Sequence, residues 1–144
     1  IYEMSLNPKY RDMKWEFSKE KFNKWCSGQT GFPIVDACMR ELNATGYMHN
    51  RGRLIVSNFL CRLLHIDWRH GEKYFAQQLI DYDPAQNNFG WQVSGANTSG
   101  TTSRPLEQTI LNPWLQSWQF DREGIYIKKW CFFRILFFQT MILL

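Results

Sequence analysis

Apolar residues recur three or four positions apart along most of this chain, and that period predicts helices rather than strands. No stretch keeps the strict alternation that is typical of a half-buried strand. The sequence therefore predicts an all-α fold. The predicted helices begin at Ser18, Pro33, Asn50, Trp68, Pro84 and Asp121, and they end near Gly28, Leu42, Leu64, Ile80, Val93 and Trp130.

Short polar residues and prolines mark several of these helix starts. Ser18, Asp67 and Asp83 can each cap a helix by accepting a hydrogen bond from a backbone N–H of the first turn. Pro33 and Pro84 suit first-turn positions because a helix needs no N–H there. These signals define the first residues of the predicted helices more precisely than the last ones.

The apolar faces of the second, third and fourth helices are predicted to form the core. The chain has 144 residues, which suits one domain with room for a sizeable core. The residues expected to face inward are Ile34, Val35, Cys38, Met39, Leu42, Leu54, Ile55, Phe59, Leu60, Leu63, Tyr74, Phe75 and Leu79.

The last part of the chain differs from the rest. A polar loop is expected at residues 94–105 and a turn at Asn112–Pro113. In residues 131–144, eleven of the fourteen are Cys, Phe, Ile, Leu or Met. A membrane span needs about 20 residues, so this run is too short, and Arg134 interrupts it. We expect a domain at residues 1–130 and a separate apolar tail, which is a buried helix, an interfacial segment or the product of a shifted reading frame.

Composition narrows the possible functions. Aromatic residues make up 17% of the chain, including seven Trp, and the net charge is +4. These values suit a protein that stacks planar ligands and tolerates an anionic partner. The four cysteines and three histidines form no metal-binding motif, and the sequence contains no P-loop or GxGxxG motif. We interpret the cysteines as reduced thiols of an intracellular protein without a bound metal.

Polar residues cluster within residues 48–91 in a way that a plain helical core does not require. Arg51 and Arg53 fall in the first turn of a predicted helix, where the helix dipole disfavours cations. Asp81 and Asp83 lie close enough to repel each other unless a cation balances them. One interpretation is an arginine–carboxylate ion pair that joins two helix ends. A carboxylate pair used as general acid and base is less favoured, because no nucleophile motif accompanies it.

Several motifs in this region occur together in a fixed order. The motifs are Thr30–Ala37, Thr45–Arg51, Ile66–Arg69, Leu79–Asp83 and Asn87–Gln92. Together they resemble the C-terminal flavin-binding domain of the DNA photolyase and cryptochrome family, with similarity over residues 15–130. The resemblance implies a multi-helix orthogonal bundle that holds FAD.

The resemblance also assigns roles to individual residues. It implies that Arg53 pairs with Asp81 and that Asn87 lies beside flavin N5, where an amide adds no charge. It implies DNA contacts by Asn50 and Arg51. The full cofactor-binding set that it implies is Asp81, Tyr82, Asp83, Asn87, Arg53 and Asn50.

Three tryptophans match the family's electron-transfer chain from the flavin to the surface: Trp91, Trp68 and Trp15. Closely spaced indoles can relay an electron because each is an oxidisable aromatic ring. Without the surrounding motifs, core packing would be the favoured interpretation of all three. Within this motif set, the resemblance implies a catalytic role in electron transfer.

The implied function is blue-light-driven repair of cyclobutane pyrimidine dimers in DNA. The branch that repairs (6-4) lesions places histidines at the positions of Asn50 and Leu54, which this chain does not. Val93 stands where repair enzymes usually carry a tryptophan. A cryptochrome-like photoreceptor without repair activity and an inactive helical remnant are therefore alternatives. The family's antenna domain and phosphate-binding loop have no counterpart here, so we expect a fragment with a separate chain as partner.

Overall fold

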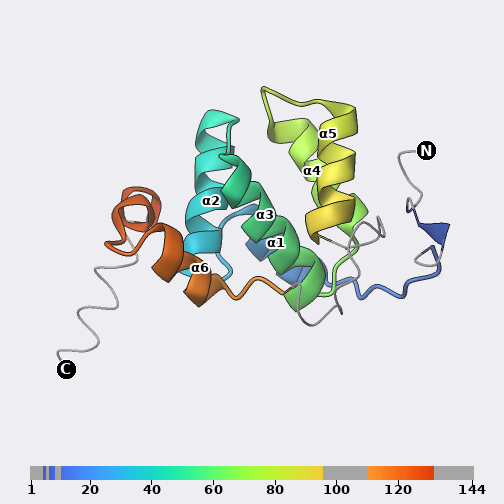
Figure 1. Ribbon diagram of the computed structural model, residues 1–144, viewed down its shortest axis with the longest axis horizontal. Coiled ribbons are helices and arrows are strands. Elements are labelled where there is room, and N and C mark those ends of the chain that lie inside the picture. Colours follow the sequence, from blue (N-terminus) through green and yellow to red (C-terminus); the bar gives the residue numbers. More distant parts are fainter. Residues whose placement is uncertain (1–4, 6, 9–10, 96–109, 132–144) are drawn as a thin grey trace.

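The computed structural model describes residues 5, 7, 8, 11–95 and 110–131. Within these ranges it contains helices and no strand, which confirms the predicted all-α class (Figure 1). The predicted loop beyond residue 95 and the tail beyond residue 131 lie outside the described residues. The helices are α1 (Lys19–Cys26), α2 (Pro33–Thr45), α3 (Asn50–Asn58), η2 (Phe59–Leu63), α4 (Trp68–Gln78), α5 (Pro84–Gly90), η3 (Trp91–Gly95) and α6 (Pro113–Phe120), and residues 125–131 are also helical.

The predicted caps start the helices as expected. The Ser18 hydroxyl accepts a hydrogen bond from the Lys21 backbone N–H at 3.3 Å. The Asp67 carboxylate accepts a hydrogen bond from the Arg69 backbone N–H at 3.0 Å, and the Asp83 carboxylate accepts one from the Gln86 backbone N–H at 2.7 Å. Each carboxylate or hydroxyl satisfies an N–H that has no partner inside its helix, so these caps stabilise the ends on which the site depends.

The core lies where α2, α3 and α4 meet. The whole predicted stripe of α2 is buried. Trp25 from α1 is fully buried, and its indole N–H donates to the Val56 carbonyl at 3.1 Å. Gly71 on α4 allows the Trp91 ring to lie directly against the helix backbone, because any side chain at residue 71 would overlap that ring. Large aromatic residues thus bring the outer helices onto the central ones.

Two α-helices continue into π-helical turns, which the sequence analysis did not predict. α3 ends at Asn58 and continues as η2, whose Leu64 N–H bonds to the Phe59 carbonyl at 3.1 Å. The extra residue in the turn rotates the following side chains away from the predicted stripe. The inward placement of Leu63 was therefore wrong, since that side chain is 38% exposed. Likewise α5 continues as η3, so helical structure extends into the segment predicted as a loop from residue 94.

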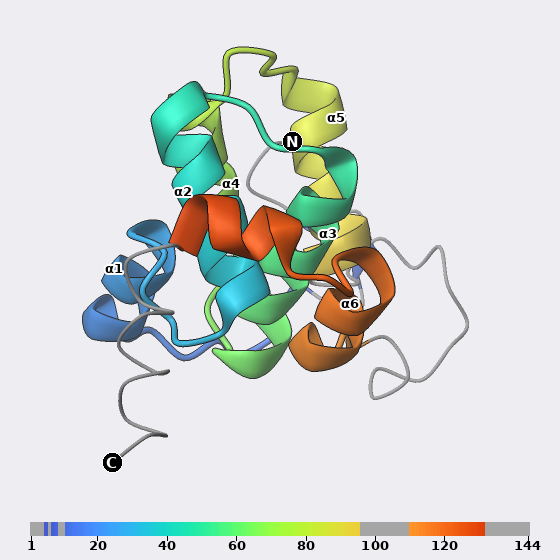
Figure 2. The same ribbon diagram turned by 90° about the vertical axis from the view of Figure 1, so that its left-hand side faces the viewer.

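The segment after residue 109 also differs in detail from the prediction. The expected turn at Asn112–Pro113 is the start of α6, and the expected helix from Asp121 begins four residues later, at residue 125. The Asp121 side chain caps that helix, because its carboxylate accepts hydrogen bonds from the backbone N–H groups of Tyr126 and Ile127 at 3.0 and 2.8 Å. Figure 2 shows residues 125–131 lying across α2, and the Tyr126 hydroxyl donates to the Glu41 carboxylate at 2.6 Å.

In the described part of the chain, no helix is both long enough and apolar enough to cross a membrane.

The fourth predicted helix ends earlier than expected, at Gln78 rather than Ile80, and Ile80 is 79% exposed. All four cysteines are free.

Candidate functional site

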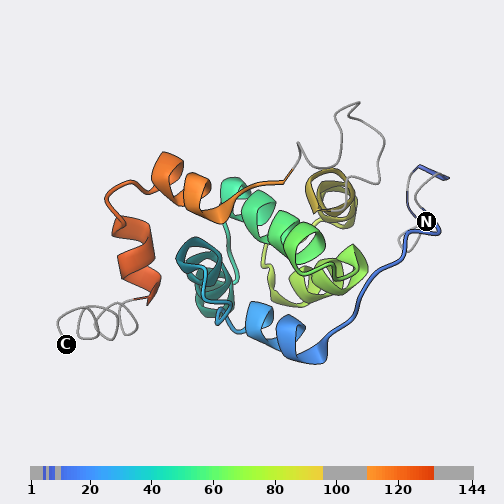
Figure 3. The same ribbon diagram turned by 90° about the horizontal axis from the view of Figure 1, so that it is seen from below.

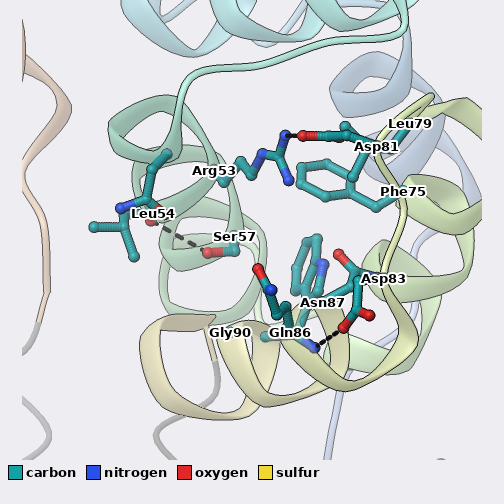
Figure 4. Close-up of a pocket in the computed structure, with 12 residues that line it drawn as sticks. Arg53, Leu54, Ser57, Phe75, Leu79, Asp81, Asp83, Gln86, Asn87 and Gly90 are labelled. Atoms are coloured by element: carbon teal, nitrogen blue, oxygen red, sulfur yellow. Dashed lines mark hydrogen bonds and ion pairs between the residues drawn. The ribbon is translucent and has the colours of Figure 1, made fainter.

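A cavity of about 130 Å³ opens between α3, the end of α4 and α5, and we call it the first cavity (Figure 4). Its walls combine apolar side chains with charged and amide groups. Six of the residues predicted as site residues line it: Asn50, Arg53, Asp81, Asp83, Asn87 and Trp91. Residues up to 41 positions apart in the sequence thus share one cavity.

Arg53 and Asp81 form an ion pair at the rim of the first cavity. One terminal nitrogen of Arg53, Nη2, lies 2.9 and 2.7 Å from the two carboxylate oxygens of Asp81. The Arg53 Nε also donates to the Met48 carbonyl at 2.8 Å, which orients the guanidinium. The backbone N–H of Ile80 bonds to the Gly46 carbonyl at 2.9 Å and so holds the segment before Asp81 in place. This pair is the helix-end ion pair that the sequence suggested.

Gly46 makes this arrangement possible. It ends α2 in a left-handed conformation with φ of 70°. A side chain there would also collide with Ile80, since an added Cβ would lie 2.7 Å from the Ile80 Cγ2. The close approach of the two backbones at residues 46 and 80 brings Asp81 within reach of Arg53.

Asn87 lies on α5 and is held by a residue that the sequence analysis missed. Its side-chain Nδ2 donates to the Glu72 carboxylate at 3.1 Å and to the Glu72 carbonyl at 3.3 Å. The Tyr82 hydroxyl donates to the same carboxylate oxygen at 3.2 Å. Glu72 therefore fixes two predicted site residues at once. Because both bonds of the Asn87 side chain use its nitrogen, its oxygen is left to accept a hydrogen bond from a ligand in the cavity.

Asp83 and Tyr82 belong to one sequence motif, but their side chains lie in different places. Asp83 lines the first cavity and also caps α5 through Gln86, so its carboxylate is fixed in orientation. The Tyr82 side chain instead points to Glu72 on α4 and is not among the residues that line the cavity.

Asn50 and Arg51 are neighbours in sequence but face different spaces. Asn50 lines the first cavity. Arg51 lines a second cavity of about 220 Å³, between the first turn of α3 and the segment from Phe120 to Tyr126. The guanidinium carbon of Arg51 lies 4.5 Å from the centre of the Phe120 ring. The first turn of α3 therefore separates the two cavities.

The three predicted electron-transfer tryptophans lie at different depths. Trp91 lines the first cavity and is 2% exposed. Trp68 is fully buried, and its indole N–H has no hydrogen-bond partner in the described part of the chain. Trp15 is partly buried and lines a third cavity near His65. Trp68 is thus the most deeply buried of the three, Trp91 borders the first cavity and Trp15 is the most exposed.

The ring contacts of Trp91 are with residues outside that series. Its ring centre lies 6.0 Å from that of Trp25 and 5.1 Å from that of Phe75, both edge to face. Among the described aromatic pairs, none joins Trp91 to Trp68 or Trp68 to Trp15. The sequence analysis did not predict Trp25 as a neighbour of the site, because it belongs to none of the motifs. Its position in the sequence is typical of an aromatic residue in a helical core.

The first cavity suits the edge of a planar heteroaromatic ring. Leu54, Phe75 and Leu79 give it apolar walls, while Asn87 and Asp81 offer hydrogen-bond acceptors. Ligand pockets of whole small molecules usually measure about 300–1,000 Å³, so the described residues enclose less than a complete dinucleotide needs. The residues present therefore fit the edge of a flavin ring.

Comparison with known proteins agrees with the family resemblance found in the sequence. The family model for the FAD binding domain of DNA photolyase matches residues 1–132. A deoxyribodipyrimidine photo-lyase of Neurospora crassa is 48% identical over 125 residues, which are 87% of this chain and 20% of that protein.

Solved structures agree with that result. The crystal structure of an archaeal photolyase from Sulfolobus tokodaii, with two FAD molecules, matches with a TM-score of 0.82 and 43% identity, over 90% of this chain and 29% of that one. The Synechocystis cryptochrome matches with a TM-score of 0.78 and 42% identity, over 83% of this chain and 24% of that one. The chain thus spans 20–29% of the length of these three proteins.

Proposed function

The chain belongs to the family of FAD-binding domains of DNA photolyases, and on this premise we propose that it forms the flavin-holding part of an enzyme that repairs cyclobutane pyrimidine dimers. FAD is the cofactor that this family of domains binds. The chain spans 20–29% of the length of the relatives it matches. Repair activity, the DNA substrate and a partner chain are therefore parts of the proposal. We propose the domain at residues 1–130 and a tail at residues 131–144.

The observation that carries the proposal is the Asn87 side chain at the first cavity. Glu72 binds the amide nitrogen, so the amide oxygen is available to a hydrogen-bond donor of the flavin. Arg53 balances the charge of Asp81 at the opposite rim. We propose that Asn87, Asp81 and Asp83 bind the flavin ring, and that Asn50 lies between the flavin and the DNA lesion.

When bound, reduced FAD supplies the electron that opens the dimer after absorption of blue light. The residues of this chain bind the ring, exclude water from it and orient the hydrogen bonds around it. Phe75 and Leu79 are buried and give the cavity a wall with a low dielectric constant. Hydrogen bonds and charges at such a wall act more strongly than in water.

We propose that Trp91, Trp68 and Trp15 carry electrons between the surface and the flavin. The position of Trp91 at the first cavity and the partial exposure of Trp15 support these two as the ends of the path. The absence of direct ring contact between them in the described part of the chain is compatible with electron hopping, which does not require van der Waals contact. Replacing Trp91 with Phe would remove the first oxidisable ring while preserving most of the packing against Phe75.

Flavin binding tests the proposal directly. The purified chain is mixed with FAD, and flavin absorbance is measured after removal of the free cofactor. Bound flavin that is lost in Asn87→Ala and Asp81→Ala, but retained in the exposed variant Lys73→Ala, would support it. Absence of bound flavin in every case would show that the chain needs a separate partner chain, or that it is an inactive remnant.

A cryptochrome-like photoreceptor is the second candidate function. The similarity to the Synechocystis cryptochrome supports it, as does Val93 in place of a tryptophan. A dimer-repair assay under blue light distinguishes the two, with the flavin-loaded chain and damaged oligonucleotides. Repaired dimers support the photolyase, whereas flavin binding without repair supports the photoreceptor.

A further inference from the structure

The third cavity, beside Trp15, is not explained by binding of the flavin. It measures about 250 Å³, and seven described residues line it: Met13, Lys14, Trp15, Cys61, Arg62, His65 and Ile110. None of these seven lines the first cavity. In Figure 3, the extended segment before α1, drawn in blue, runs along the outside of the bundle. Lys14 and His65 are exposed, so the third cavity opens to solvent.

A backbone hydrogen bond holds two walls of the third cavity together. The Glu16 N–H donates to the His65 carbonyl at 2.9 Å, which joins the segment that carries Trp15 to the end of η2. His65 has a φ of 56°, a left-handed conformation that is uncommon for residues other than glycine. Backbone strain of this kind is concentrated at functional sites. The strained residue and the indole thus border the same space.

The side chains that line the third cavity carry positive charge and no negative charge. Lys14 and Arg62 are cationic at neutral pH, and the His65 ring offers an N–H donor. None of the seven described lining residues is an aspartate or a glutamate. Burial raises the pKa of the Cys61 thiol, so this group stays protonated and neutral. The lining therefore favours an anion.

The carboxylates nearest in sequence do not line the third cavity. Asp67 lies two residues after His65, but its carboxylate is paired with Arg69 at 2.8 Å and also caps α4. Glu16 follows Trp15 and is exposed, so water screens its charge. An anion in the cavity would thus meet mainly cationic and N–H groups.

Trp15 gives the third cavity a flat aromatic wall. Met13 and Ile110 add apolar surface around it. A planar ligand can stack on the indole while its charge faces Lys14 or Arg62. The volume is below the about 300–1,000 Å³ that is usual for pockets of drug-sized ligands, so the ligand must be small. The third cavity therefore suits a small planar anion.

Trp15 is also the outer end of the proposed electron path. Once Trp15 has given an electron toward the flavin, it must regain one before the path can be used again. A donor that occupies the third cavity would contact the indole directly.

We propose that the third cavity binds a small anionic reductant of the enediol class, which restores the electron that Trp15 has lost. One electron passes from the enediol monoanion to the oxidised indole, which returns to its neutral form. The donor becomes a radical and releases its hydroxyl proton to water. The inference rests on the proposed function, because it takes Trp15 as the end of the electron path.

Binding is measured first, in the absence of flavin. The complete chain of 144 residues is titrated with sodium ascorbate under anaerobic conditions in a calorimeter. Lys14→Glu should weaken binding about tenfold, because an attractive charge at the cavity becomes a repulsive one. His65→Asn should weaken it about twofold to fivefold, since it removes the ring N–H and keeps a residue that tolerates the left-handed backbone.

Lys19→Glu is the matched control. It makes the same change in net charge at an exposed residue that does not line the third cavity, so the affinity should change less than about twofold. The substituted side chains are all exposed, so the variants should fold, and circular dichroism checks this.

Electron donation is measured next, with the flavin-loaded chain. A blue-light pulse generates the tryptophan radical, and transient absorption follows its decay at increasing ascorbate concentrations. If the donor binds before it reacts, the decay rate rises to a plateau, with half-saturation at the dissociation constant from the titration. Lys14→Glu should move the half-saturation point about tenfold and leave the plateau unchanged. Trp15→Phe should abolish the ascorbate-dependent phase.

Several results would overturn the proposal. They are no binding of ascorbate by the parent chain, equal affinities in Lys14→Glu and Lys19→Glu, and bound ascorbate that leaves the radical decay unchanged. A decay rate that rises linearly, far above the measured dissociation constant, also overturns it, because the donor then reacts by collision. A chain that binds no flavin contradicts the proposed function instead, and the titration still decides whether the third cavity binds the reductant.

Discussion

The Asn87 side chain donates a hydrogen bond to the Glu72 carboxylate, with Nδ2 and Oε1 3.1 Å apart. The same oxygen accepts a hydrogen bond from the Tyr82 hydroxyl at 3.2 Å. A single carboxylate on α4 thus holds both the segment before α5 and a side chain of α5 itself. Glu72 is therefore a positioning residue for the first cavity.

Replacing Glu72 with Ala should destabilise the chain. Asn87 and Tyr82 would both lose an acceptor at partly buried positions, which costs about 1–3 kcal/mol. Glu72→Gln keeps an acceptor oxygen and should cost less than about 1 kcal/mol. Urea unfolding measures both, with the exposed neighbour Lys73→Ala as control. Equal stability of the Ala and Gln variants would contradict the role of the Glu72 acceptor.

The Arg53–Asp81 ion pair should contribute little to stability by itself. The Arg53 and Asp81 side chains are 27% and 45% exposed, so water screens their attraction. A double-mutant cycle with Ala at both positions should give a coupling of about 0.2–1 kcal/mol, decreasing as salt is added. The control cycle is Lys24–Glu20, a more exposed pair at 55% and 77%, whose coupling should be smaller. A coupling above about 2 kcal/mol would show that the pair is effectively buried.

Two glycine substitutions should have opposite effects. At Gly71, an added methyl group would overlap the Trp91 ring and approach Leu60, so Gly71→Ala should destabilise by about 1–3 kcal/mol. At Gly90, a methyl group meets no atom within 4 Å. Because alanine favours helix over glycine, Gly90→Ala should stabilise the chain by about 0.5–1 kcal/mol. Thermal unfolding followed by circular dichroism measures both.

The same Gly90→Ala variant should bind FAD more weakly. Gly90 lines the first cavity, so the methyl group would occupy space that the flavin needs under the proposed function. A variant that is more stable without the cofactor but binds the cofactor less tightly would show that Gly90 affects flavin binding independently of folding stability. Tighter flavin binding by this variant would contradict the position of the ring.

Stability should fall at alkaline pH. Burial raises the pKa of the Cys38 thiol from 9.0 to about 12 and also raises the pKa of Cys61 and Tyr126. Above pH 9, the unfolded chain releases the Cys38 proton while the folded chain keeps it, so the free energy of unfolding decreases between pH 9 and about 12. The contribution of Cys38 is fully present below pH 9.

For one such thiol, the expected slope is about 1.4 kcal/mol per pH unit. Urea unfolding at about pH 8, 9 and 10 measures it, since only the alkaline points should differ. The matched variant is Cys38→Ala, which removes its own share of the slope whatever its effect on absolute stability. A parallel decline in the variant and the parent chain would show that the thiol plays no part.

The helix starts could be predicted because their signals are local. Ser18, Asp67 and Asp83 each bond to a backbone N–H two or three residues along the chain. The Arg53–Asp81 pair spans 28 residues, and unbalanced charges indicated only that an ion pair was needed there. The family resemblance was required to name Arg53 and Asp81 as the two partners.

The errors and omissions arise where packing outweighs local preference. Leu63 fits the 3.6-residue period, but η2 inserts an extra residue in the turn and moves it to the surface. Glu72 lies 10 and 15 residues from Tyr82 and Asn87, and nothing near it in the sequence distinguishes it from a solvated helix residue. Such contacts exist only after α4 and α5 pack together.

The first turn of α3 also constrains how this protein can evolve. Asn50 and Arg51 line the first and second cavities respectively, one residue apart. The connection before it, residues 47–49, is not helical, so a change in its length can be absorbed there. An insertion or deletion of one residue between Arg51 and Ile55 would instead rotate Asn50 and Arg51 by about 100° relative to the buried side of α3. Both cavities would then lose these side chains together. Descendants of this sequence can exchange the two residues independently, but they cannot change the length of this turn without altering both cavities.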